Sequence, residues 1–167
     1  MKEYLSILTL LTFLCMQSCQ RTTLDEIMDK VDHANLTPMH GIGVTLRRSS
    51  LGSQHLNINS YEYNCAPYIV FFDTWKSRVT SIRYMGGSEE CAKEYLDDFT
   101  IESAIGCWAD MGLPFGFMGI NLEGVVYIST RGWDEPPDLM RIPEGIPFTD
   151  TLRFKLYRDN WYVRKLR

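Results

Sequence analysis

The fold of this chain is decided by residues 42–85, IGVTLRRSSLGSQHLNINSYEYNCAPYIVFFDTWKSRVTSIRYM. Ile42, Val44 and Leu46 alternate with small or polar residues, a pattern that is typical of a half-buried strand. Residues 68–72 (YIVFF) are all apolar, which favours a central strand covered on both faces. Turn residues separate four such segments, so the stretch predicts four consecutive strands in an antiparallel meander.

Helices are predicted on both sides of this meander. Thr23 and Glu26 are spaced as a capping box, and the apolar residues after them predict a helix over residues 24–34. Beyond the meander, Ser88 is placed to begin a second helix. Its apolar stripe, which ends at Phe99, is out of phase with the stripe that follows. We therefore expect a central helix that breaks at residues 98–100, where Thr100 caps its second segment.

The remaining segments are predicted to extend the sheet. We expect a glycine-rich loop over residues 115–119 and a strand over residues 124–130. Residues 131–147 contain four prolines and no periodicity, and they predict a long loop. Long loops are often functional, although a rigid surface loop stiffened by proline is the alternative.

The clearest local pattern predicts a hairpin over residues 152–166 that closes the fold. Its turn is Asp159-Asn160, and its apolar side chains are expected to share one buried face. These side chains are Leu152, Phe154, Leu156, Trp161 and Val163. The whole pattern predicts an α+β fold: an antiparallel sheet of about six or seven strands with an N-terminal helix and a broken central helix packed on it.

The N-terminus has the features of an export signal. Lys2 precedes an apolar run over residues 5–14, which is shorter than the ~20 residues of a transmembrane helix. The run leads to residues 16–19 (MQSC), which resemble the lipobox of bacterial lipoproteins in a form similar to that of the Bacteroidota. The resemblance implies cleavage before Cys19 and attachment of diacylglycerol to its sulfur.

Two alternatives bear on this N-terminus. Cys15 is a rival cleavage site, but Leu14 before it is bulky where a small residue is expected. The apolar run would otherwise be an ordinary buried helix. With cleavage before Cys19, the chain divides into a signal peptide (1–18), a lipidated tether (19–23) and one domain (24–167). The protein would then be held by lipid on the cell membrane or outer membrane, facing the periplasm or the cell surface.

Composition and charge limit the classes of protein and partner that are compatible with this chain. The chain of 167 residues is 45% hydrophobic and 13% aromatic, as in a globular protein that builds its own core. Its net charge of −4 argues against a nucleic-acid partner. Three cysteines remain in the expected domain, Cys65, Cys91 and Cys107, and an odd number allows one disulfide with one free thiol, or three buried thiols.

Motifs for a metal site or a catalytic site are weak in this sequence. The three histidines have no metal-ligand spacing and the cysteines form no CxxC pair, so we expect no metal and no cofactor. A hydrolase would need Cys65 with His40 or His55 as base, or a carboxylate pair. The acids available for such a pair are Asp134, Glu135 and Asp138, and neighbouring acids in a proline-rich loop are usually solvated.

The sequence favours a binding function over a catalytic one. Trp133 lies in the long loop beside Asp134 and Glu135, where an aromatic face with polar neighbours would contact a protein or a glycan. The alternative is a Trp packed under its own loop. The last hairpin is rich in Arg and Lys, which would meet an acidic partner or anionic headgroups, or would simply be solvated edge-strand residues.

We therefore expect a lipid-anchored envelope protein with a non-catalytic binding or accessory domain. An envelope hydrolase and an immunity-type inhibitor of an incoming toxin are the alternatives.

Overall fold

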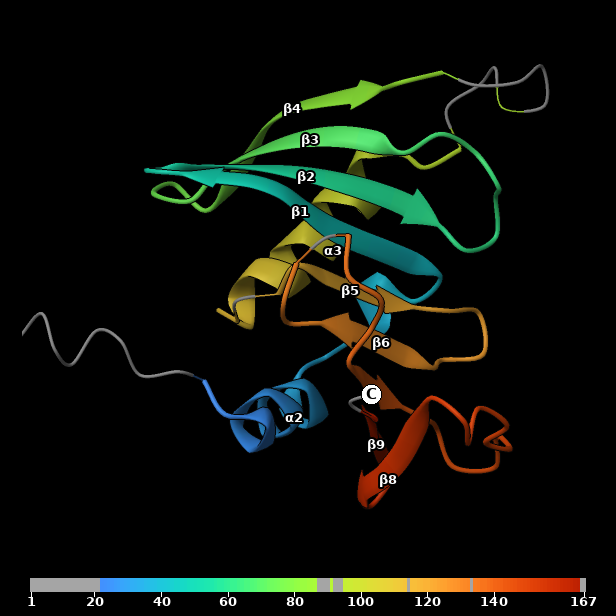
Figure 1. The fold of residues 1–167 in the computed structure, drawn as a ribbon. Coiled ribbons are helices and arrows are strands. Elements are labelled where there is room, and N and C mark those ends of the chain that lie inside the picture. Colours follow the sequence, from blue (N-terminus) through green and yellow to red (C-terminus); the bar gives the residue numbers. More distant parts are fainter. Residues whose placement is uncertain (1–21, 87–90, 92–94, 114, 133, 166–167) are drawn as a thin grey trace, which may run out of the picture.

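The described residues form one curved antiparallel sheet with two α-helices on its inner face (Figure 1). The computed structural model describes residues 22–86, 91, 95–113, 115–132 and 134–165. The strands lie in the order β4-β3-β2-β1-β5-β6-β7-β9-β8. The elements are α2 (Leu24–His33), a 3-10 turn η1 (Thr37–Met39), β1 (Ile42–Ser50), β2 (Ser53–Ser60), β3 (Tyr68–Asp73), β4 (Arg78–Tyr84), α3 (Asp98–Asp110), β5 (Phe117–Ile120), β6 (Val126–Ser129), β7 (Leu139–Arg141), β8 (Phe154–Arg158) and β9 (Trp161–Arg164).

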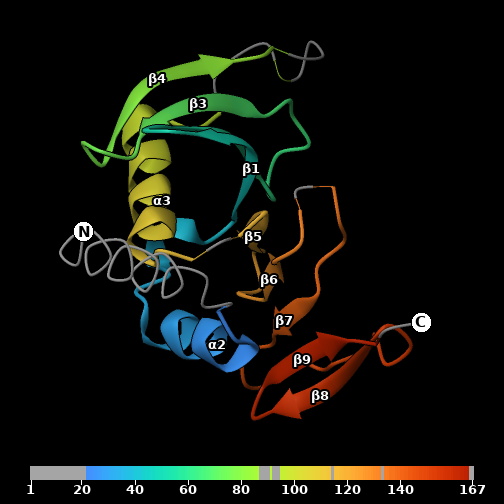
Figure 2. The same cartoon turned by 60° about the vertical axis from the view of Figure 1, so that its left-hand side comes forward.

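The curvature of the sheet creates two inner surfaces, and one helix covers each. Figure 2 shows the sheet as an arc from β4 to β8, with α3 inside the upper part and α2 inside the lower part. The apolar stripe of α3 is buried as predicted, and so are three residues of α2. The buried helix residues are Ile27, Met28, Val31, Ile101, Ala104, Ile105 and Trp108. Neither described α-helix has the length and apolar character to cross a membrane.

The α+β class and the four-strand meander are confirmed, but the strand number is wrong. The sheet has nine strands instead of six or seven, because β5 occupies part of the predicted glycine-rich loop and β7 lies inside the predicted long loop. In β5, Gly119 pairs with Gly43 of β1 on the outer face. A side chain at Gly119 would collide with Phe117 and Tyr61, so this glycine marks close packing within a strand.

The predicted broken helix is also wrong. The described residues 95–97 are not helical, and α3 begins at Asp98 with Asp97 as its N-cap. The Asp97 carboxylate accepts a hydrogen bond of 2.7 Å from the N–H of Thr100, so Thr100 is not the cap. The predicted start at Ser88 lies outside the described residues.

In the segment before α3, tyrosine hydroxyls form hydrogen bonds with backbone groups that a helix would pair with one another. The Tyr68 hydroxyl accepts from the N–H groups of Tyr95 and Leu96, at 2.8 and 3.0 Å. The Tyr84 hydroxyl donates to the carbonyl of Cys91. These side-chain contacts satisfy backbone groups that a helix would have paired internally, which is why the apolar spacing alone predicted the wrong structure.

One disulfide joins Cys65 to Cys91, and Cys107 is a free thiol. The bond ties the loop between β2 and β3 to the segment before α3. Closing a chain of 26 residues stabilises the folded state by about 3–4 kcal/mol in the chain-entropy description.

Candidate functional site

The candidate site lies at one end of the lower sheet, where several elements begin or end together. β6 and β9 end there, β7 and β8 begin there, and α2 starts beside them. Two adjoining hollows of about 620 and 610 Å³ open at this end. They share Arg131, Asp138, Arg164 and Lys165 in their walls.

Asp138 holds this end of the sheet together. Its carboxylate accepts hydrogen bonds from the N–H of Thr130 at 3.1 Å and from the hydroxyl of Thr130 at 2.6 Å. Its backbone carbonyl accepts from the N–H of Arg164 at 2.8 Å, and Nε of Arg131 lies 3.8 Å from its carboxylate. Asp138 therefore fixes the loop and β9, and its carboxylate oxygens already accept hydrogen bonds from Thr130.

The predicted binding residues lie on the loop between β6 and β7. Trp133 lies outside the described residues. Asp134 and Glu135 are exposed, and Glu135 lines the second hollow. The buried Ser129 hydroxyl donates a hydrogen bond of 2.8 Å to the carbonyl of Gly132 and holds the first turn of the loop. The structure therefore places Glu135 beside the basic residues of the hairpin.

Positive charge is in excess around the two hollows. The walls contain five cations and three acids. Arg153 forms an ion pair of 2.6 Å with Asp150, and its hydrogen bond holds the pKa of the Asp150 carboxyl below the usual range, with Arg164 adding to the shift. Lys155 and Arg164 form no ion pair with any residue that the structure describes. The cations are Arg131, Arg153, Lys155, Arg164 and Lys165, and the acids are Glu135, Asp138 and Asp150.

Sequence reasoning identified the basic hairpin but missed its neighbours. Arg131 and Leu24 are 107 positions apart in the sequence and yet line one hollow together with Lys155. Only the order of the strands brings them together, and no local pattern contains that order. Arg167, at the end of the basic segment, lies outside the described residues.

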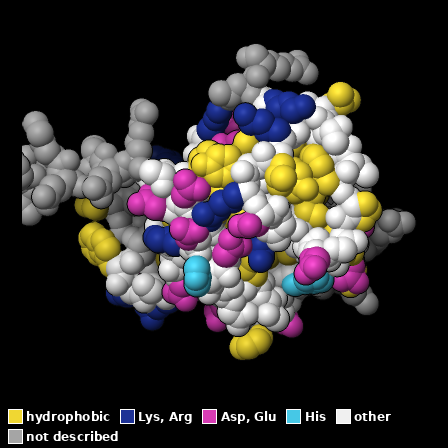
Figure 3. All heavy atoms as spheres, turned by 90° about the horizontal axis from the view of Figure 1, so that it is seen from below, with side chains coloured by type: hydrophobic (Ala, Val, Ile, Leu, Met, Phe, Trp, Pro, Cys, Tyr) yellow, Lys and Arg dark blue, Asp and Glu magenta, His cyan; other side chains and the backbone are white. Residues whose placement is uncertain are grey.

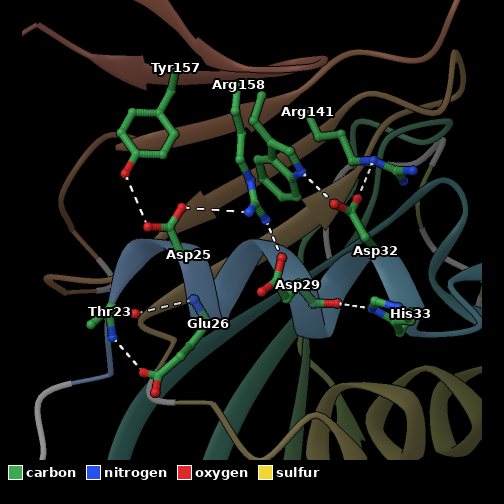
Figure 4. A network of polar contacts seen from close by, with 10 residues as sticks. Thr23, Asp25, Glu26, Asp29, Asp32, His33, Arg141, Tyr157 and Arg158 are labelled. Carbon is green, nitrogen blue, oxygen red and sulfur yellow. Dashed lines mark hydrogen bonds and ion pairs between the residues drawn. The ribbon is translucent and has the colours of Figure 1, made fainter.

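A row of aspartates positions α2 against the hairpin (Figure 4). Asp29 pairs with Arg158, while Asp32 accepts a hydrogen bond of 3.0 Å from Nε1 of Trp161 and lies 2.9 Å from Nε of Arg141. Figure 3 shows the result on the side of the molecule that carries α2, where acidic and basic side chains lie close together. Leu24, the first residue of α2, lines one of the two charged hollows.

The cysteines that the structure describes form one disulfide and one free thiol. Cys65 is in the disulfide and has no thiol, so it cannot act with His40 or His55 in the way that the hydrolase alternative requires. Cys107 lines a groove of about 620 Å³ between α2 and α3, where burial, with the nearby Asp110, raises the pKa of its thiol. A raised pKa lowers the fraction of reactive thiolate.

No group of three or more His, Cys, Asp or Glu side chains is placed to hold a metal ion in the part of the chain that the structure describes.

No protein family, curated protein or solved structure significantly matches this chain.

Proposed function

We propose that this protein is a lipid-anchored protein of the cell envelope whose folded domain binds a partner without catalysis. The observation that carries the proposal is the MQSC junction at residues 16–19, directly after a short apolar run. The disulfide between Cys65 and Cys91 supports export, because such bonds persist in oxidising compartments outside the cytosol.

The loop between β6 and β7 is the proposed contact surface, through Trp133, Asp134 and Glu135. Ser129 and Asp138 hold the two ends of this loop, and Pro136 and Pro137 restrict its backbone. A loop that is already ordered loses less conformational entropy on binding a protein or a glycan.

A binding role is favoured over the hydrolase alternative because two of the groups named for hydrolysis, Cys65 and Asp138, have other contacts. Cys65 is oxidised, and Asp138 is bonded to Thr130. The remaining thiol, on Cys107, has a raised pKa and donates a hydrogen bond to the carbonyl of Asn35 at 3.3 Å.

Metabolic labelling with a palmitate analogue tests the anchor. Cys19→Ala should abolish the label and either release the protein from the membrane fraction or leave the signal uncleaved. Cys15→Ala is the matched control and should keep the label. Label that persists in Cys19→Ala, or is absent from the wild type, contradicts the anchor.

Crosslinking in membranes tests the contact surface. Trp133→Ala should weaken binding of the partner by ~2 kcal/mol, so that less partner is captured, while the melting temperature of the protein stays unchanged. Trp75→Ala, at the exposed turn between β3 and β4, should leave capture unchanged. A large fall in melting temperature for Trp133→Ala would instead place Trp133 in the core.

A further inference from the structure

The cations of the charged hollows lie beside the start of α2. Leu24, the first residue of this helix, lines the same hollow as Lys155, Arg164 and Lys165. The Lys165 ammonium donates a hydrogen bond of 2.7 Å to the carbonyl of Thr151, which holds this side chain beside the hollow. We define the basic surface as Arg131, Arg153, Lys155, Arg164 and Lys165.

The length of the tether limits how far this surface can be from a lipid at Cys19. Four residues lie between Cys19 and Leu24, so the five steps of a fully extended chain place them no more than about 18 Å apart. An anchored domain therefore keeps the basic surface close to the headgroups, and the aspartates of α2 fix the helix to the hairpin that carries these cations.

We infer that the basic surface docks on anionic phospholipid headgroups of the membrane that holds the anchor. The inference rests on the proposed lipid anchor and adds an orientation to it: the lower end of the sheet faces the bilayer, and β4 faces away. Each Lys or Arg near an anionic surface favours association about fivefold. Leu152, which is 88% exposed, lines the second hollow and adds an apolar side chain at the headgroup level.

The membrane is favoured over an acidic macromolecule in solution. The whole chain carries a net charge of −4, so its positive charge is local and its long-range field does not attract polyanions. The tether supplies the high local concentration that a small basic surface needs in order to dock.

The test uses the chemical reactivity of the protein's own lysines. The lipidated full-length protein is placed in vesicles of phosphatidylcholine, with or without phosphatidylglycerol, and acetylated with a water-soluble succinimidyl ester. Lys155 and Lys165 should react at least fivefold more slowly on the anionic vesicles, and high salt should remove the difference. Lys30 and Lys76, outside the basic surface, should react equally on both vesicles.

Matched variants separate docking from folding. Arg153→Gln with Arg164→Gln keeps both reporter lysines and should abolish their protection. Arg78→Gln with Arg83→Gln removes the same charge from β4, at the far edge of the sheet, and should leave the protection intact. Equal reactivity of Lys155 and Lys165 on both vesicles, or protection that survives Arg153→Gln with Arg164→Gln, overturns the docking.

Flotation separates this inference from the anchor. A lipidated protein floats with phosphatidylcholine vesicles whether or not it docks. Failure to float there rejects the anchor, while lysine protection on anionic vesicles still decides the docking.

Discussion

At the scale of single residues, Asp32 connects α2 to the sheet. Its carboxylate accepts from the indole N–H of Trp161, a fully buried side chain, and pairs with Arg141. Losing an acceptor for a buried donor costs more than losing an exposed ion pair, because the donor is left without a partner.

We expect Asp32→Ala to lower the free energy of unfolding by about 1–3 kcal/mol, as for a buried donor left unsatisfied. Asp29→Ala removes the same charge from the same helix, but its exposed pair with Arg158 should contribute little. Urea denaturation of both variants measures the difference. Equal losses would show that the Trp161 hydrogen bond has no special weight.

Tyr61 makes stability depend on pH in the alkaline range. Burial raises the pKa of its hydroxyl to about 12, and Tyr127 adds to the shift. The unfolded state loses this proton near pH 10 and the folded state only near pH 12, so its contribution is complete below pH 10 and is lost as the pH rises through 12. Tyr61→Phe should therefore show a shallower fall of unfolding free energy over this range. An unchanged slope in urea denaturation would contradict this.

At the scale of elements, the last hairpin shows how one residue reverses a prediction. The hairpin and its turn were predicted correctly, but a bulge between Leu156 and Arg158 shifts the register. A shift of one residue moves every side chain before it to the opposite face. Phe154 therefore joins an outer cluster with Met140, while Trp161 joins the main core. Alternation of apolar residues cannot reveal such a bulge.

Phe154→Ala and Leu156→Ala distinguish the observed register, which contains the bulge, from the predicted register without it. Sequence alternation treats these residues alike, but Phe154 is 7% exposed and Leu156 is 59% exposed. Phe154→Ala should cost about 3 kcal/mol of stability, whereas Leu156→Ala should change it by about 0.5 kcal/mol or less. Thermal or chemical unfolding of the two variants gives the comparison. Similar large losses of stability in both variants would instead support the predicted hairpin, in which Phe154 and Leu156 share one buried face.

The N-terminal helix was predicted well, and strands β5 and β7 were not predicted. The capping box of α2 is present, with hydrogen bonds of 2.7 and 3.2 Å between Thr23 and Glu26. β5 and β7 have only four and three residues, and neither shows an alternating pattern. Their structure comes from neighbouring strands that pair with them, which is tertiary information.

At the scale of the whole molecule, strand order creates the candidate site. Sequence patterns identified the basic hairpin and the acidic residues of the long loop, but as separate features. Pairing of β7 with both β6 and β9 brings the loop, the hairpin and the start of α2 to one end of the sheet. Asp138 then fixes that arrangement through Thr130. The same hollow contains Leu24 and Arg131, which are 107 positions apart in the sequence, so local patterns could not predict the whole arrangement.

The length of the tether should control how strongly the domain docks. Inserting twenty Gly and Ser residues between Arg21 and Thr22 lengthens the path from Cys19 to α2 about fivefold. The effective concentration of the basic surface at the membrane should then fall roughly tenfold, following the −3/2 power of linker length. Acetylation of Lys155 and Lys165 on anionic vesicles should rise toward its rate on neutral vesicles, while the melting temperature stays the same. Protection that is unaffected by the insertion would mean that docking does not depend on the anchor.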